Sequence, residues 1–294
     1  MPAYLIFALT AAFFYSLSGL FTKQAMAQGC GPLRIFMTQA WFGALLLSPF
    51  LFRGTPMSTS VWWQPALAAV FWFSAYTLYV HTLRDGDLSI IGPVAGIKPV
   101  FNALLIALLL REQVPLSTWI ACGLAALALF IMRTPSSHGS HSFGRTAIQT
   151  LIAVFLLALT DLCIQRWAHE WGSLRFSAFI FLGAALLSLG LIPRLGKKYA
   201  VLAPATRRLL FIGAFFACLP GICVGFAIGT FGHGAEVNIT YSIHVLITLA
   251  VVWTFGRHFN NQEHTAGHCI FLRRTAGAVI LLIAVALIIS GHVP

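Results

Sequence analysis

Ten long apolar segments dominate this sequence and restrict what it can fold into. They cover roughly residues 3–27, 33–52, 64–83, 88–110, 115–132, 147–168, 174–193, 208–229, 236–256 and 273–291, and Gly, Pro and charged residues separate them. A helix needs about 20 apolar residues to cross the hydrocarbon core of a membrane. The pattern therefore predicts an all-α polytopic membrane protein with ten transmembrane helices and no soluble domain.

The scarcity of charge leads to the same class. Of the 294 residues, 59% are hydrophobic and only 9% are charged, whereas a soluble domain carries about a quarter charged residues. This excludes a large soluble core, a disordered chain and a secreted disulfide scaffold. The formal net charge is +11, but the basic residues occur mostly singly between apolar segments, so we expect no nucleic-acid partner. The cysteines lack C-x₂-C spacing, and we predict no metal and no cofactor.

A polar tract at residues 134–146 divides the chain into two halves, 1–133 and 147–294, with five apolar segments each. Its Ser, His and Gly residues are typical of a linker loop, although a His-rich tract can also bind metal. At an offset of 141, Leu33-Arg34 matches Leu174-Arg175, and at an offset of 146, Gly86 matches Gly232. A five-helix unit and its copy enter the membrane from opposite sides. We therefore expect two inverted five-helix repeats, which are typical of transporters with a substrate site near the membrane midplane.

Residues 84–123 carry an ordered set of short motifs. These are Gly86-Asp87-Leu88-Ser89-Ile90-Ile91-Gly92-Pro93, Lys98-Pro99-Val100-Phe101, Arg111-Glu112 and Gly123. The set resembles the fourth-to-fifth helix pattern of EamA-type members of the drug/metabolite transporter superfamily, with Arg111 at the position of the usual Gly. The second half of the chain departs further from this pattern, because Glu263 is displaced from the expected position and no Pro-Val-Phe occurs near Val245. The resemblance implies ten helices, two inverted repeats and transport of small polar metabolites such as amino acids.

Three ionisable residues stand out within the apolar segments, where burial in lipid is costly unless the side chain faces the protein interior. Lys98 lies near the middle of segment 88–110, and His244 is its counterpart at an offset of 146. Asp161 lies past the middle of segment 147–168. We interpret Lys98 as a ligand for a carboxylate or phosphate, the alternative being a structural ion pair with Asp161 or Glu236. His244 is either a titrating or ligand-contacting group or a hydrogen-bonded core histidine.

The segment that carries Lys98 should be irregular. Gly96 and Pro99 flank Lys98, and proline removes a backbone donor and disfavours α geometry in the residue before it. Asn102 lies one turn after Lys98 and shares its face.

Aromatic residues follow helical spacing in two other segments. Trp72, Tyr76 and Tyr79 share one face of the third segment, and Tyr241 and His244 share a face of the ninth. Such stripes either line a pocket or pack in the core. The predicted substrate-binding residues are Lys98, Asn102, Tyr76, Tyr79, Asp161, Glu236, Tyr241 and His244. In the eighth segment, Gly221, Gly225 and Gly229 repeat the G-x-x-x-G spacing that allows two helices to pack closely.

No catalytic or nucleotide-binding motif occurs, so we do not expect an enzyme. We hypothesise a secondary active transporter, an exporter or exchanger, of a small polar metabolite such as an amino acid or organic anion, working by alternating access. The alternative is a lipid-head-group translocase or a non-transporting membrane assembly subunit. The expected partners are the metabolite and membrane lipid, and a homodimer is possible. The expected location is a bacterial inner membrane. Lys and Arg bias between the loops places both termini outside, whereas the family resemblance implies both inside.

Overall fold

The computed structural model describes residues 2–85, 91, 94–132, 143–195, 202–255 and 268–290, and this part of the chain is helical with no strand. The α-helices are α1 (Ala3–Ala27), α2 (Pro32–Leu51), α3 (Trp63–Asp85), α5 (Lys98–Leu105), α6 (Leu116–Ile131), α7 (Phe143–Trp171), α8 (Ser173–Leu189), α9 (Pro204–Phe231), α10 (Gly234–Tyr241), α11 (His244–Phe255) and α12 (His268–Ser290). Short 3₁₀ helices cover Thr59–Val61 and Ile192–Leu195, and a π-helix, Ile106–Leu110, continues α5. The prediction of an all-α chain is confirmed for these residues. Of the predicted linker, residues 134–142 lie outside them, as do Gly86, Gly92, Pro93 and Glu263.

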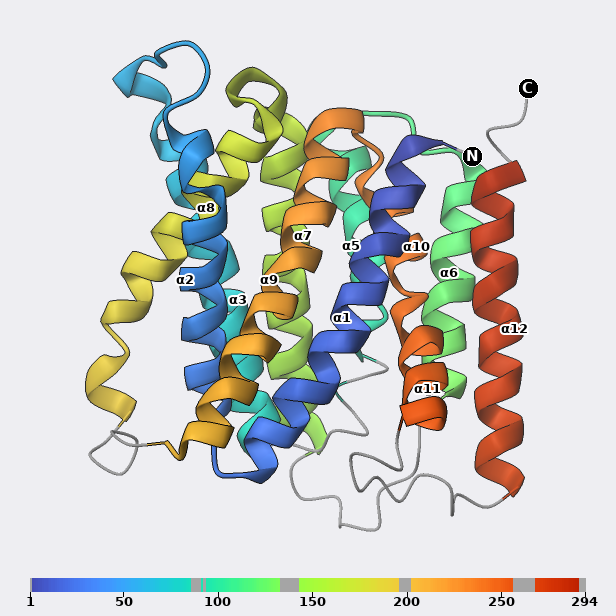
Figure 1. Ribbon diagram of the computed structural model, residues 1–294. Helices are drawn as coiled ribbons and strands as arrows, with labels where there is room; N and C mark the ends of the chain where they lie inside the picture. The colour runs from blue at the N-terminus through green and yellow to red at the C-terminus, as the bar shows by residue number, and fades with distance from the viewer. Residues whose placement is uncertain are drawn as a thin grey trace.

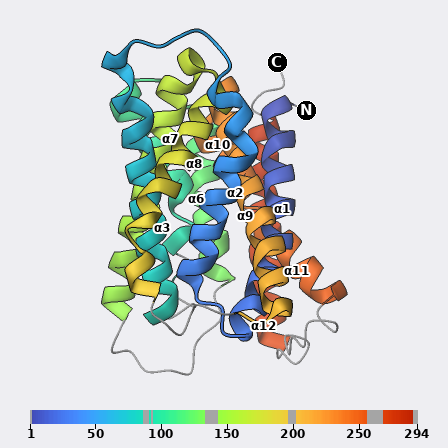
Figure 2. The same ribbon diagram turned by 60° about the vertical axis from the view of Figure 1, so that its left-hand side comes forward.

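The helices run side by side as an elongated bundle (Figures 1 and 2). The start of α1 and the end of α12 lie at the same end of the bundle (Figure 1). This agrees with the prediction that both termini lie on the same side of the membrane.

Helices of the two halves interleave. The closest pairs are α1 with α9, α3 with α7, α6 with α12 and α2 with α8, and each pair joins a helix of the first half to one of the second. The main hydrophobic core runs through both halves. The two halves therefore form one body, and residues far apart in sequence meet between them.

The outer surface suits lipid. By length and composition, α1, residues 144–171 of α7 and α9 are each able to cross a membrane, and four of the other described helical stretches are apolar but shorter. Large apolar side chains such as Leu45, Leu108 and Leu116 are highly exposed on the bundle. A soluble protein would not leave so many of them facing water.

Two of the predicted segments are broken into shorter helices: the irregularity predicted for segment 88–110 is confirmed, whereas the expectation of one continuous helix over 236–256 was wrong. Within segment 88–110, the chain turns at Gly96 and Ile97, and α5 begins at Lys98. Pro99 cannot donate to a preceding carbonyl, but proline suits the first turn of a new helix. Lys98 thus sits at a helix start and not in the middle of a regular helix.

The second break divides segment 236–256 into α10 and α11. Ser242 and Ile243 form the turn between them, and α11 begins at His244. Ser242 Oγ donates to the carbonyl of Asn238 at 2.9 Å, a local bond of the kind that competes with regular helix geometry. Both breaks come directly before an ionisable residue.

The repeated glycines of α9 mark a close helix contact. A Cβ atom at Gly225 would lie 2.8 Å from Ser177 Oγ of α8, and one at Gly229 would lie 2.8 Å from Ala168 Cβ of α7. The interpretation of the G-x-x-x-G spacing as a packing motif is confirmed.

Candidate functional site

A cavity of about 770 Å³ lies between the two halves, with walls from α1, α2, α3 and α5–α11. Six of the eight predicted site residues line it, namely Tyr76, Tyr79, Lys98, Asp161, Tyr241 and His244. The lining reaches Met132, directly after α6 ends. This volume suits a small metabolite.

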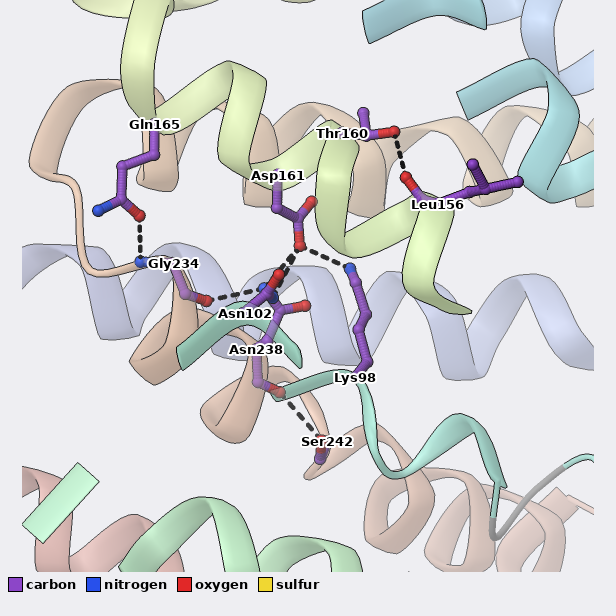
Figure 3. Close-up of polar contacts among 9 residues, drawn as sticks. All are labelled: Lys98, Asn102, Leu156, Thr160, Asp161, Gln165, Gly234, Asn238 and Ser242. Atoms are coloured by element: carbon purple, nitrogen blue, oxygen red, sulfur yellow. Dashed lines mark hydrogen bonds and ion pairs between the residues drawn. The ribbon is translucent and has the colours of Figure 1, made fainter. Parts of the chain in front are cut away.

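An ion pair forms part of the cavity wall (Figure 3). Lys98 Nζ lies 2.8 Å from Asp161 Oδ2, and the two side chains are 19% and 9% exposed. A buried ion pair is retained only when further hydrogen bonds satisfy its atoms. Here Asn102 and Asn238 provide them, because each side-chain amide donates to the same oxygen, Asp161 Oδ2, at 3.1 and 2.8 Å.

Both charged groups of the ion pair keep atoms that can form further bonds to a ligand in the cavity. Asp161 Oδ2 receives all three donors, and within the described part of the chain Oδ1 accepts no hydrogen bond. The ammonium of Lys98 carries three N–H donors, and one of them meets Asp161. An anionic group and a cationic group can therefore bind side by side here.

Local helix structure positions this pair. Lys98 is the first residue of α5 because the break at Gly96 and Ile97 restarts the helix there. Asn102, one turn on, points to the same carboxylate, as its shared face with Lys98 predicts. Asp161 comes from α7 and Asn238 from α10, so three helices meet at one oxygen atom.

Aromatic rings form another part of the wall. The Tyr76 ring stacks on Phe36, with centroids 5.4 Å apart, and lies 4.4 Å from the Trp72 ring. The Tyr15 ring packs edge-on against Tyr241 at 5.8 Å. Trp72, Tyr76 and Tyr79 all line the cavity, as the pocket interpretation of this stripe expects.

His244 belongs to the aromatic wall. Its ring lies 4.5 Å from the ring of Tyr15 and 4.8 Å from that of Tyr241. Nδ1 is 2.8 Å from the carbonyl oxygen of Tyr241, so Nε2 is the nitrogen left for other contacts. Thr248, four residues after His244 in α11, donates to Ser16 Oγ of α1 at 3.0 Å.

Two predicted site residues do not line the cavity. Asn102 is 2% exposed and lies behind Asp161, where it holds the carboxylate. Glu236 does not pair with Lys98. Its carboxylate accepts hydrogen bonds from Tyr4 Oη at 2.6 Å and Thr118 Oγ1 at 3.4 Å in a separate cluster.

Six further polar residues of the cavity wall were not predicted as site residues: Tyr15, Gln39, Thr160, Ser177, Asn238 and Ser242. Asn238 had a usable signal, since it precedes Tyr241 by three residues on the same helix face. Gln39 is a single amide in an apolar helix, and its Nε2 donates to the carbonyl of Ala217 at 2.9 Å. Among the described residues, no group of three or more His, Cys, Asp or Glu side chains is placed to hold a metal ion.

Part of the chain matches a known protein family. Residues 2–134 match the model of the EamA-like transporter family. The first half of the chain is thus similar to this family. This match confirms the resemblance to the drug/metabolite transporter superfamily. Together with the apolar helices, it makes the protein a multi-pass integral membrane protein of the transporter class.

No curated protein is significantly similar to the chain. Among the solved structures that match the chain, one described as a crystal structure of a protein has a TM-score of 0.76 and 13% sequence identity. The match covers 97% of this chain and 96% of that chain. At this identity, the likeness concerns the fold alone.

Proposed function

We propose that this protein is a secondary transporter of small zwitterionic or anionic metabolites, with amino acids as the first class to test. The observation that carries the proposal is the Lys98–Asp161 ion pair on the wall of the central cavity. Charged groups within a membrane protein usually mark a substrate or ion pathway.

The ion pair suits a zwitterion because both charges can exchange partners without being left unpaired. A substrate carboxylate would take the free N–H donors of Lys98, and a substrate ammonium would bind Asp161 Oδ1. Removing either partner alone would leave a buried charge uncompensated. The aromatic wall around Tyr76 would contact the apolar part of the substrate.

The positions of the two helix breaks support ten transmembrane helices in two inverted repeats. The breaks come directly before Lys98 and His244, which are 146 residues apart, and both residues line the cavity. A site at the interface of two repeats is the arrangement that alternating access uses. We infer that transport runs on a gradient or by exchange, in a bacterial inner membrane.

The test is ligand-induced thermal stabilisation of the purified protein with a panel of amino acids, organic anions and nucleotides. Ligand at 100 times its Kd stabilises the folded state by about 2.7 kcal/mol. We expect at least one hit with the wild type and its loss in Lys98→Ala. Lys23→Ala, which removes the exposed lysine of α1, should keep the hit.

Two results would overturn the proposal. One is a hit that Lys98→Ala retains in full, which would place the ligand elsewhere. The other is the absence of hits with well-folded protein, which would favour a lipid-head-group translocase or an assembly subunit.

A further inference from the structure

A second polar cluster lies apart from the cavity and is centred on Glu236. The Glu236 carboxylate is buried, with the side chain 5% exposed. It accepts hydrogen bonds from Tyr4 Oη at 2.6 Å and Thr118 Oγ1 at 3.4 Å, and His233 Nδ1 lies 3.4 Å from Oε2. The His233 ring also stacks on Tyr4, with centroids 4.9 Å apart. The cluster thus joins α1, α6 and α10.

This cluster lies at the end of the bundle away from Met132, the residue that the cavity reaches at the other end. Thr118 is in the first turn of α6, whereas Met132 directly follows its last residue. Tyr4 is in the first turn of α1. The Glu236 cluster therefore holds three helices together across one end of the cavity.

A neighbouring network holds the start of α10 at the same end. Gln165 Nε2 donates to Glu112 Oε2 at 2.9 Å, and the backbone N–H of Gly234 donates to Gln165 Oε1 at 3.0 Å. Figure 3 shows Gln165 reaching Gly234 beside the Asp161 site. Opening the cavity at this end requires both sets of contacts to loosen.

A proton can reach Glu236 from water through one side chain. The His233 side chain is 43% exposed, and its Nδ1 faces the buried carboxylate. Histidine changes its charge near neutral pH and acts as a proton shuttle. The hydrogen bond to Glu236 raises the pKa of His233 above its ordinary value, with burial acting against this.

Glu236 and the substrate site share one short helix. α10 has eight residues and carries both Glu236 and Asn238. Asn238 Nδ2 donates to Asp161 Oδ2 at 2.8 Å. A shift of α10 after a change at Glu236 would therefore move one of the three donors that hold the ion pair.

We propose that Glu236 is the proton-coupling site of the transporter and that its protonation releases the closed end of the cavity. The proton passes from His233 Nδ1 to Glu236 Oε2, leaving a neutral imidazole and a neutral carboxylic acid, and the imidazole takes a new proton from water. The carboxylic acid attracts Tyr4 Oη and His233 less strongly than the carboxylate did. The inference rests on the proposed transport function and adds its coupling ion.

The titratable groups around Glu236 come from several elements. α1 provides Tyr4, α6 provides Cys122, and Glu112 faces His233. α7 and α5 provide Asp161 and Lys98, which pair with each other. α9 and α12 also contact α10, and residues 220–231 and 275–290 of these two helices contain no charged residue.

The experiment uses proteoliposomes and an equimolar mixture of the twenty L-amino acids as the probe. Exchange of labelled for unlabelled mixture, without a gradient, measures transport alone. Accumulation under a one-unit pH gradient, imposed in each direction, measures coupling. One pH unit can drive about tenfold accumulation for each proton coupled. We expect Glu236→Gln to retain exchange within about threefold and to lose the response to the gradient.

A matched control and a second variant keep the test decisive. Glu170→Gln neutralises another glutamate beside a histidine, His169 at 3.8 Å, in an exposed pair, and should leave both measurements unchanged. His233→Gln keeps Glu236 but removes its proton donor, and should weaken the gradient response even if Glu236→Gln does not fold.

The outcomes separate the two proposals. Absence of exchange in the wild type overturns amino-acid transport and this inference with it. Wild-type exchange without accumulation under either pH gradient overturns the inference alone. So does a gradient response that Glu236→Gln or a folded His233→Gln retains in full. Accumulation driven by a Na⁺ gradient and abolished by Glu236→Gln overturns the assignment of the proton as coupling ion.

Discussion

Asn238 Nδ2 donates a hydrogen bond of 2.8 Å to Asp161 Oδ2 and so joins α10 to α7 at the cavity wall. The same amide donates to the carbonyl of Gly234 within its own helix, also at 2.8 Å. Because Asn238 is 2% exposed, these bonds cannot be replaced by bonds to bulk water. The position of α10 is therefore tied to the charge of Asp161.

This contact predicts that Asn238→Asp destabilises the protein more than Asn238→Ala does. The aspartate would place a second carboxylate against Asp161, and two adjacent carboxylates cannot both ionise without cost. We expect a difference of at least about 1 kcal/mol, seen as a lower thermal midpoint in detergent at neutral pH. Equal midpoints for the two variants would contradict an ionised Asp161 at this position.

The close contact at Gly229 predicts a cost for even one added methyl group. Gly229→Ala places a Cβ 2.8 Å from Ala168 Cβ and 3.0 Å from Ser173 Cβ. Overpacking of this kind costs about 1–3 kcal/mol. In Gly19→Ala the new Cβ meets no atom within 4 Å, so this control should be neutral or slightly stabilising in its helix. Similar thermal midpoints for both variants would disprove the close approach of α9 to α7.

The backbone conformation of Arg111 predicts that a change to glycine stabilises the protein. Its φ is 57° and its ψ is 28°, the left-handed region, which costs an L-residue roughly 1–2 kcal/mol. Glycine loses somewhat more entropy on folding, so Arg111→Gly should stabilise by about 0.5–1 kcal/mol. Arg53→Gly, at a residue without positive φ, should destabilise. Denaturation midpoints of both variants give the comparison, and a loss of stability in Arg111→Gly would contradict the expected strain.

The His233–Glu236 pair predicts a pH-dependent part of the stability. The hydrogen bond to Glu236 raises the pKa of His233 in the folded state. Its stabilisation is therefore complete below the ordinary histidine pKa and is lost as the pH rises through the raised value. Since the side chain is 43% exposed, we expect less than about 1 kcal/mol.

Thermal midpoints from pH 5.5 to 9 test this sign. The advantage of the wild type over His233→Gln should shrink as the pH rises. His169→Gln, in the more exposed pair with Glu170, serves as the control and should show a smaller dependence. An advantage that grows with pH would mean that His233 is stabilised in its neutral form.

Several features of the fold and the candidate site followed from local sequence patterns. The helical spacing of Trp72, Tyr76 and Tyr79 predicted a shared face, and all three rings line the cavity. The proline after Lys98 predicted an irregular helix, and the chain breaks at Gly96 and Ile97. The break before His244 was not predicted, because Ser242 has no strong helix-breaking signal in sequence and acts only through its bond to Asn238.

The sequence alone determined the class of this protein, since hydropathy and helical spacing depend only on neighbouring residues. It also identified Lys98 and Asp161 as costly charges inside apolar segments. Only the tertiary structure decided that Lys98 pairs with Asp161 and that Glu236 joins Tyr4 at the end of the bundle. The physical reason is that these contacts depend on how α1, α5, α7 and α10 pack across the two halves, which no local pattern records.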